Sequence, residues 1–73
     1  RKRMHVKKEF LIEFVNLVNE CCAVMDHDHV AEWLDKPNPD LNMEKPIEMF
    51  MDDVGRDKVY RLLYFIEIGE ADL

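Results

Sequence analysis

The 73-residue sequence contains no serine and no threonine, and glycine occurs only at Gly55 and Gly69. The first absence excludes serine and threonine nucleophiles, and two glycines are too few for a glycine-rich phosphate-binding loop. Paired carboxylates occur at Asp52 and Asp53, but a general acid needs a pocket that shifts its pKa, and a few short helices seldom enclose one. We therefore expect a protein that is not an enzyme and that uses no cofactor.

Cysteine is also scarce, and the two residues present, Cys21 and Cys22, are adjacent. Neighbouring residues on a helix point about 100° apart, so a disulfide between them would be strained. We expect two free thiols packed as small core residues in a reducing compartment, the cytoplasm, with a reactive thiol pair as the alternative. No run approaches the roughly 18 apolar residues of a membrane span and no signal peptide is recognisable, so no membrane partner is expected.

Acidic residues are missing from the start of the chain, although the formal net charge is −6. All sixteen of them lie from Glu9 onward, whereas five of the ten basic residues precede it: Arg1, Lys2, Arg3, Lys7 and Lys8. We predict a basic N-terminal arm over residues 1–8 and a single domain over residues 9–73. An acidic domain repels nucleic acid and suits a basic protein partner, with contact of the arm to nucleic acid as the alternative.

The spacing of the apolar residues predicts helices. From Lys8 to about Met25 they fill an arc about 180° wide, broader than the roughly 100° stripe of a surface helix. Either the other helices wrap around this long helix, or part of its face meets another chain, as in a homodimer. Three shorter helices are expected to start at Asp26 as an N-cap, at Pro46 and at about Val54. The expected fold class is therefore all-α: a small bundle of about four helices, one long and N-terminal and three shorter.

Two histidines, His27 and His29, alternate with Asp26 and Asp28 at the start of the second expected helix. This pattern is similar to a metal-binding cluster. Residues two apart on a helix point to different sides, however, and no third ligand follows. We expect a helix start and no bound metal.

The segment Pro37-Asn38-Pro39 predicts a rigid corner, because proline cannot continue a helix and restricts the residue before it. Leu41 is the one apolar residue able to hold this corner against a core. We expect the corner to set the helix that carries Trp33 against the last helix.

The last expected helix, residues 54–68 with Gly69 as C-cap, has a narrow apolar stripe. That stripe consists of Val59, Leu62, Leu63 and Ile66. Four large side chains lie outside it: Tyr60, Tyr64, Phe65 and Ile68. Exposed aromatic clusters are typical of interfaces, so these residues predict contact with another protein; coverage by the long first helix is the alternative.

Residues 33–69, "WLDKPNPDLNMEKPIEMFMDDVGRDKVYRLLYFIEIG", carry a motif with fixed spacing. A Trp-Leu pair precedes Pro-Asn-Pro and a leucine, a proline opens the next helix, and a glycine begins the final helix with its Leu-Leu pair and Ile-Glu-x-Gly end. The positions concerned are Trp33, Leu34, Pro37, Asn38, Pro39, Leu41, Pro46, Gly55, Val59, Leu62, Leu63, Ile66, Glu67 and Gly69. This half of the chain resembles the C-terminal toxin-binding domain of Xre/MbcA/ParS-type antitoxins.

The resemblance implies a domain that binds and neutralises a RES-domain toxin, an enzyme that consumes NAD. In such antitoxins the last helix and the C-terminal tail lie over the toxin's active site. The residues expected to bind the partner are Tyr60, Tyr64, Phe65, Ile68, Gly69, Glu70 and Leu73. Full-length members dimerise and bind DNA through a separate N-terminal domain, so nucleic-acid binding is expected only through such a domain.

The sequence departs from the family pattern at several positions. Asn42-Met43 replaces the usual Gly-Gly. Glu44-Lys45 replaces the usual Arg-Thr before the proline, so no side-chain cap is expected from Lys45 at the start of the helix that Pro46 opens. The last helix carries Tyr64, Phe65 and Ile68 where the family often has Gly, Arg and His. The alternative function is a helical homodimer with a structural or regulatory role and no RES toxin partner.

Overall fold

The computed structural model describes residues 7–71, and the regular structure of this range is helical, with an isolated bridge between Asn38 and Glu44. The elements in chain order are α1 (Lys8–Val24), α2 (His27–Leu34), the 3-10 turn η1 (Pro39–Leu41), α3 (Pro46–Met49) and α4 (Asp53–Glu67). The prediction of an all-α bundle with one long N-terminal helix and three shorter ones is confirmed. Residues 1–6 of the expected basic arm, and Leu73, lie outside the described residues.

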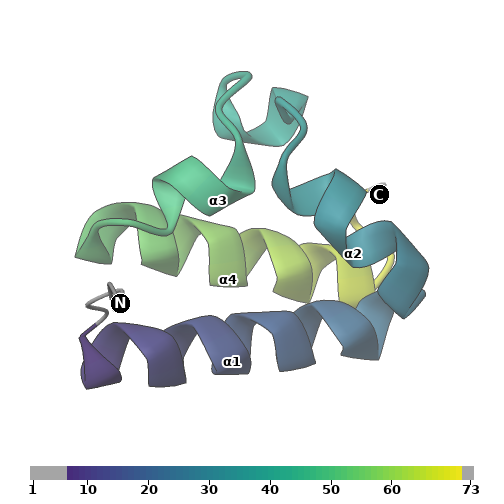
Figure 1. Cartoon of the computed structure of the whole chain (residues 1–73). Helices are drawn as coiled ribbons and strands as arrows, with labels where there is room; N and C mark the ends of the chain where they lie inside the picture. The colour runs from purple at the N-terminus through teal and green to yellow at the C-terminus, as the bar shows by residue number, and fades with distance from the viewer. Residues whose placement is uncertain (1–6, 72–73) are drawn as a thin grey trace.

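The two longest helices form the base of the bundle. α1 and α4 lie side by side and run in the same direction, while α2, η1 and α3 cover them from one side (Figure 1). The main contacts of α2 are with α1 and α3, whereas η1 packs on α4. The corner itself therefore lies on the last helix, and the helix of Trp33 is held chiefly by α1 and α3.

The core lies between these layers, and α1, α2, η1 and α4 contribute to it together with the short segments at Met25 and Phe50. Its buried members are Leu17, Cys21, Met25, Val30, Trp33, Leu34, Leu41, Phe50, Val59, Leu62 and Leu63. Burial of apolar surface is the dominant favourable contribution to folding, and each large side chain among them contributes roughly 1.5–3 kcal/mol. The predicted stripe of α4 and the predicted anchor of the corner, Leu41, are part of this one core.

Asn38 is the centre of the corner and is buried. Its side-chain Oδ1 accepts a hydrogen bond from the Asp40 backbone N–H at 2.9 Å. Its backbone N–H donates to the carbonyl of Glu44 at 3.1 Å, and its carbonyl accepts from the N–H of Met43 at 2.8 Å. These bonds satisfy the polar groups of a buried turn, which would otherwise oppose folding.

The chain reverses after η1 through two consecutive residues in the left-handed conformation, Asn42 (φ 57°) and Met43 (φ 66°). Asparagine tolerates this conformation, whereas for methionine it costs roughly 1–2 kcal/mol. Glycine adopts it without that steric cost. These are the two positions at which the resemblance described above leads one to expect Gly-Gly.

The ends of α4 are held by side-chain and backbone hydrogen bonds. At its start, the Asp52 carboxylate accepts from the N–H of Gly55 at 2.7 Å. At its end, Gly69 is left-handed (φ 82°). The N–H of Gly69 donates to the carbonyl of Ile66, and the N–H of Glu70 donates to the carbonyl of Phe65; together these two hydrogen bonds form a Schellman motif. Gly69 thus terminates the helix as predicted.

The three helices α1, α2 and α3 begin without a side-chain cap. Asp26 occupies the N-cap position of α2, but its carboxylate makes no capping hydrogen bond; the backbone carbonyl of Asp26 instead accepts from the N–H of His29 at 2.8 Å. α2 therefore starts with Asp26 as its N-cap residue, as predicted, but without the side-chain hydrogen bond that usually accompanies this position. Lys45 precedes α3 without a side-chain cap, in agreement with the expectation.

Candidate functional site

The carboxyl-terminal end of α4 exposes three large apolar side chains. Tyr64 is 57 % exposed, Phe65 39 % and Ile68 50 %. The rings of Tyr64 and Phe65 lie 5.8 Å apart and are tilted by 56°. Gly69 and Glu70 follow and are also exposed. These five residues form the α4 terminal surface, which contains all the predicted partner-binding residues except Tyr60 and the undescribed Leu73.

Tyr60 lies differently from the other three expected side chains. Its ring packs edge-on against the ring of Phe50, with centroids 5.7 Å apart, and its hydroxyl lies 3.5 Å from the backbone carbonyl of Glu13 on α1. Burial raises the pKa of Tyr60, and the negative charges of Glu13 and Glu20 raise it further. Tyr60 therefore contributes to the contact between α1 and α4 rather than to an exposed surface, as the alternative interpretation expected.

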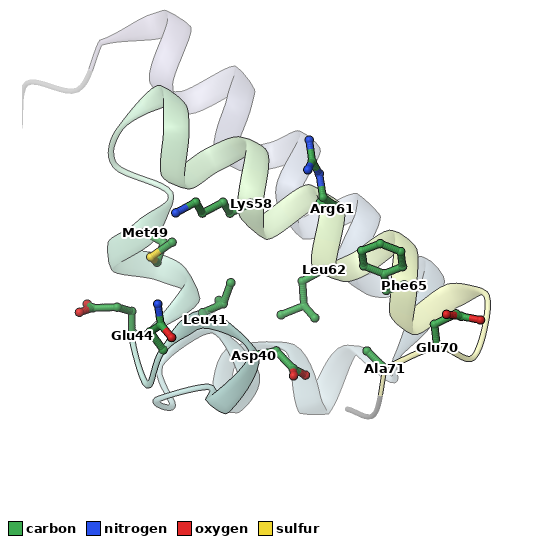
Figure 2. A pocket seen from close by; sticks show the side chains of 11 residues that line it. Asp40, Leu41, Glu44, Met49, Lys58, Arg61, Leu62, Phe65, Glu70 and Ala71 are labelled. Atoms are coloured by element: carbon green, nitrogen blue, oxygen red, sulfur yellow. The ribbon is translucent and has the colours of Figure 1, made fainter.

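A groove of about 800 Å³ adjoins the α4 terminal surface, and Phe65 belongs to both (Figure 2). It is bounded by α4, by η1 and the loop after it, by α3 and by the tail at Glu70 and Ala71. Its apolar lining consists of Leu41, Met49, Leu62, Phe65 and Ala71. The groove is a further candidate site that was not expected from the sequence.

Charges of opposite sign border this groove. Lys58 and Arg61 lie on α4, whereas Asp40 and Glu44 lie across the groove on η1 and the loop after it (Figure 2). Arg61 pairs with Asp57 at 3.2 Å, but both side chains are solvent-exposed and such a pair is weak. The groove can therefore receive an apolar side chain, with cations along α4 and carboxylates on the opposite wall and at the tail, where Glu70 lies.

The sequence does contain a pattern that indicates one wall of the groove, the wall formed by α4. Lys58, Arg61 and Phe65 are spaced by three and four residues, which places them along one side of α4. Their spacing does not reveal what lies opposite, because the other wall comes from residues 40–44, which are distant in the sequence. The groove therefore depends on the tertiary packing of η1 on α4.

The two cysteines have different environments. Cys21 is fully buried, and burial, together with the nearby Cys22 and Glu20, raises the pKa of its thiol to about 12. A thiol with such a pKa stays protonated and is a poor nucleophile. Cys22 is exposed, so the prediction that both cysteines are core residues is wrong for Cys22. Adjacent helical positions point about 100° apart, and only one of them reaches the core.

A second apolar area lies on α1. Leu11 is 53 % exposed and Val15 51 %, and Ile12 is exposed to a similar degree. The shorter helices therefore leave part of the wide apolar arc of α1 uncovered.

The histidine-containing start of α2 lies at the surface. His27 Nε2 is 3.2 Å from Asp28 Oδ1, and His29 Nδ1 is 3.2 Å from Glu32 Oε1. Within residues 7–71, no three His, Cys, Asp or Glu side chains come together as a metal site would require.

None of the helices formed by residues 7–71 combines the length and the apolar character needed to cross a membrane. When the chain is compared with family models, with curated proteins and with solved structures, none of them matches. The geometry of the α4 terminal surface and its groove is therefore the main basis for a functional assignment.

Proposed function

We propose that this domain binds a second protein through the α4 terminal surface and the adjoining groove, and that it acts as an antitoxin whose partner is a RES-domain toxin. The observation that carries the proposal is the exposure of Tyr64, Phe65 and Ile68 together at the end of one helix. Exposed clusters of large apolar side chains in small proteins mark interaction sites. Aromatic residues are also enriched among those that dominate binding energy.

The backbone beneath this surface is held in place before any partner binds. The Schellman hydrogen bonds at Gly69 fix the last turn of α4, and Leu62 and Leu63 anchor the same turns in the core. A surface that is ordered in the free protein loses less conformational entropy on association. This favours binding by a rigid helix end over binding by a segment that folds on contact.

The turns of the domain support the resemblance to the antitoxin motif. Asn42 and Met43 adopt the left-handed conformation suited to the Gly-Gly pair of that motif. Gly55 lies so close to the Met49 carbonyl that a side chain there would overlap it, and Gly69 is left-handed. The matched glycines thus occupy positions with a physical need for glycine.

Neutralisation by such a domain requires no catalytic group of its own. The α4 terminal surface would cover the entrance to the toxin's NAD pocket, with Tyr64 and Phe65 as apolar anchors. The groove would take an apolar side chain of the toxin beside Phe65, between the cations of Lys58 and Arg61 and the carboxylates opposite. The acidic domain suits a toxin surface that is basic around its active site.

The test uses a purified RES-domain toxin whose consumption of NAD is assayed. Adding this chain is expected to inhibit consumption in proportion to its concentration until the toxin is saturated. The Tyr64→Ala/Phe65→Ala double variant is expected to inhibit far less, whereas Met51→Ala, which removes an exposed side chain from the α3–α4 connection, serves as the matched control. Full activity of the toxin at saturating wild-type chain would overturn the proposal.

A further inference from the structure

α1 carries an apolar seam on the side that the rest of the domain leaves uncovered. Leu11, Val15, Val18 and Cys22 are spaced by four, three and four residues, the spacing of the a and d positions of a coiled coil. Leu11 and Val15 are more than half exposed, Cys22 is exposed and Val18 is partly buried. These four residues are called the α1 seam.

The seam is distinct from the faces of α1 that build the monomer. The buried residues of α1 are Leu17 and Cys21, roughly 100° around the helix from the centre of the seam. Glu13, which contacts Tyr60 of α4, lies about 160° from Leu11 and Val15. The seam therefore points away from α4 and leaves the α4 terminal surface free.

We infer that the α1 seam binds the α1 seam of a second copy of this chain, with the two helices antiparallel. This spacing is typical of a helix that packs against another helix through one narrow apolar stripe. The same stripe on a second copy can fill this role, and the two copies are then related by two-fold symmetry. With the symmetry axis between Asn16 and Leu17, Val15 faces Val18 of the second copy and Leu11 faces Cys22 of the second copy. The Val15–Val18 pair and the Leu11–Cys22 pair then have similar total side-chain volumes.

The charges at the two ends of α1 favour an antiparallel arrangement of the two α1 helices. Lys7 and Lys8 precede the seam, whereas Asp26 and Asp28 follow it, and all four side chains are exposed. Antiparallel pairing places the lysines of each copy next to the aspartates of the other. Parallel pairing would place lysine beside lysine and aspartate beside aspartate, which is unfavourable. Antiparallel helix dipoles add to the same preference.

The interface offered by a four-residue seam on one helix is small, so we expect a weak and reversible dimer. Because the seam and the α4 terminal surface lie on different sides, such a dimer would present two docking surfaces at once. A partner that is itself oligomeric would then be bound more tightly than by a monomer.

The first test is the molar mass in solution, measured by light scattering and sedimentation over a wide range of concentrations. The wild-type chain is expected to pass from monomer to dimer as its concentration rises. Val15→Glu is expected to remain monomeric, while Asn16→Glu, an exposed position about 130° around the helix from the centre of the seam, is the matched control and retains the dimer. Circular dichroism checks that each variant keeps its helix content. A wild-type chain that stays monomeric, or a dimer lost in Tyr64→Glu but kept in Val15→Glu, would overturn the inference.

The second test is disulfide cross-linking, which reports direction as well as contact. Leu11→Cys places a thiol opposite Cys22 of the second copy and is expected to give a covalent dimer under mild oxidation. In the antiparallel pair the two native Cys22 residues lie about 16 Å apart along the helix axis, so the wild-type chain is expected to cross-link slowly. Glu20→Cys, off the seam, is the control and is expected to behave like wild type. Rapid cross-linking of the wild-type chain, or no gain from Leu11→Cys, would contradict the antiparallel seam.

Discussion

The α-carbon of Gly55 lies against the backbone carbonyl of Met49, so closely that a β-carbon at residue 55 would overlap that carbonyl. This contact joins the first turn of α4 to the end of α3. Asp52, which caps α4 through the N–H of Gly55, lies in the same short connection. The glycine therefore determines how closely α3 approaches α4, and with it the width of the groove.

Gly55→Ala is expected to destabilise the protein by about 2–3 kcal/mol, because the backbone of α3 must shift to make room for the methyl group. Alanine's higher helix propensity offsets only about 1 kcal/mol of this cost. Urea denaturation measures the change, and Val54→Ala, at the exposed neighbouring position, is the control with little effect. Equal stabilities of the two variants would show that the close approach does not constrain the fold.

Met43→Gly is expected to stabilise the protein by about 0.5–1 kcal/mol. The substitution removes the cost of a left-handed methionine, and this gain exceeds the extra backbone entropy of glycine in the unfolded chain. The Met43 side chain is exposed, so little packing is lost. Asn42→Gly, at the other left-handed position, is expected to give a smaller gain because asparagine tolerates this conformation. A loss of stability in Met43→Gly, measured by thermal denaturation, would contradict this explanation.

Asn38→Ala is expected to cost about 1 kcal/mol or more, because it leaves the N–H of Asp40 without its acceptor in a partly buried turn. Asn38→Asp keeps an acceptor oxygen at the same place and is expected to retain more of the stability. Chemical denaturation of both variants tests the role of the side chain. A larger loss in the aspartate variant than in the alanine variant would argue against it.

The free energy of unfolding is expected to fall as the pH rises from about 9 toward about 12. The thiol of Cys21 has an ordinary pKa of 9.0, which burial raises to about 12 in the folded protein. In this interval the unfolded chain has released the proton and the folded chain keeps it, so the folded state binds more protons and loses stability with rising pH. Cys21→Ala is expected to show a shallower decline than Cys22→Ala, which leaves the buried thiol in place. Identical declines would contradict the assignment to Cys21.

The sequence predicted the helices well because their ends are encoded locally. Pro37 and Pro46 cannot occupy helix interiors, Gly69 permits the left-handed turn that ends α4, and the apolar spacing of α1 extends over its whole length. The exposure of Tyr64, Phe65 and Ile68 also followed from spacing alone, since they lie outside the core stripe of α4.

Other features depended on which helices pack together. Tyr60 is 100° from Val59 on α4, and only the position of α1 beside α4 decides that its ring is partly buried. The burial of Cys21 rather than Cys22 depends in the same way on the direction of the core. The groove could not be predicted because its walls come from segments that meet only after η1 packs on α4.

The central claim is that Tyr64 and Phe65 anchor a partner protein, and isothermal titration calorimetry with a purified RES-domain toxin tests it most directly. Loss of an aromatic anchor typically costs about 2 kcal/mol, so Tyr64→Ala or Phe65→Ala is expected to raise the Kd about thirtyfold. Met51→Ala, also exposed and apolar but in the α3–α4 connection before α4 begins, is expected to leave the Kd unchanged. The same Kd for the wild-type chain and both aromatic variants would contradict the account.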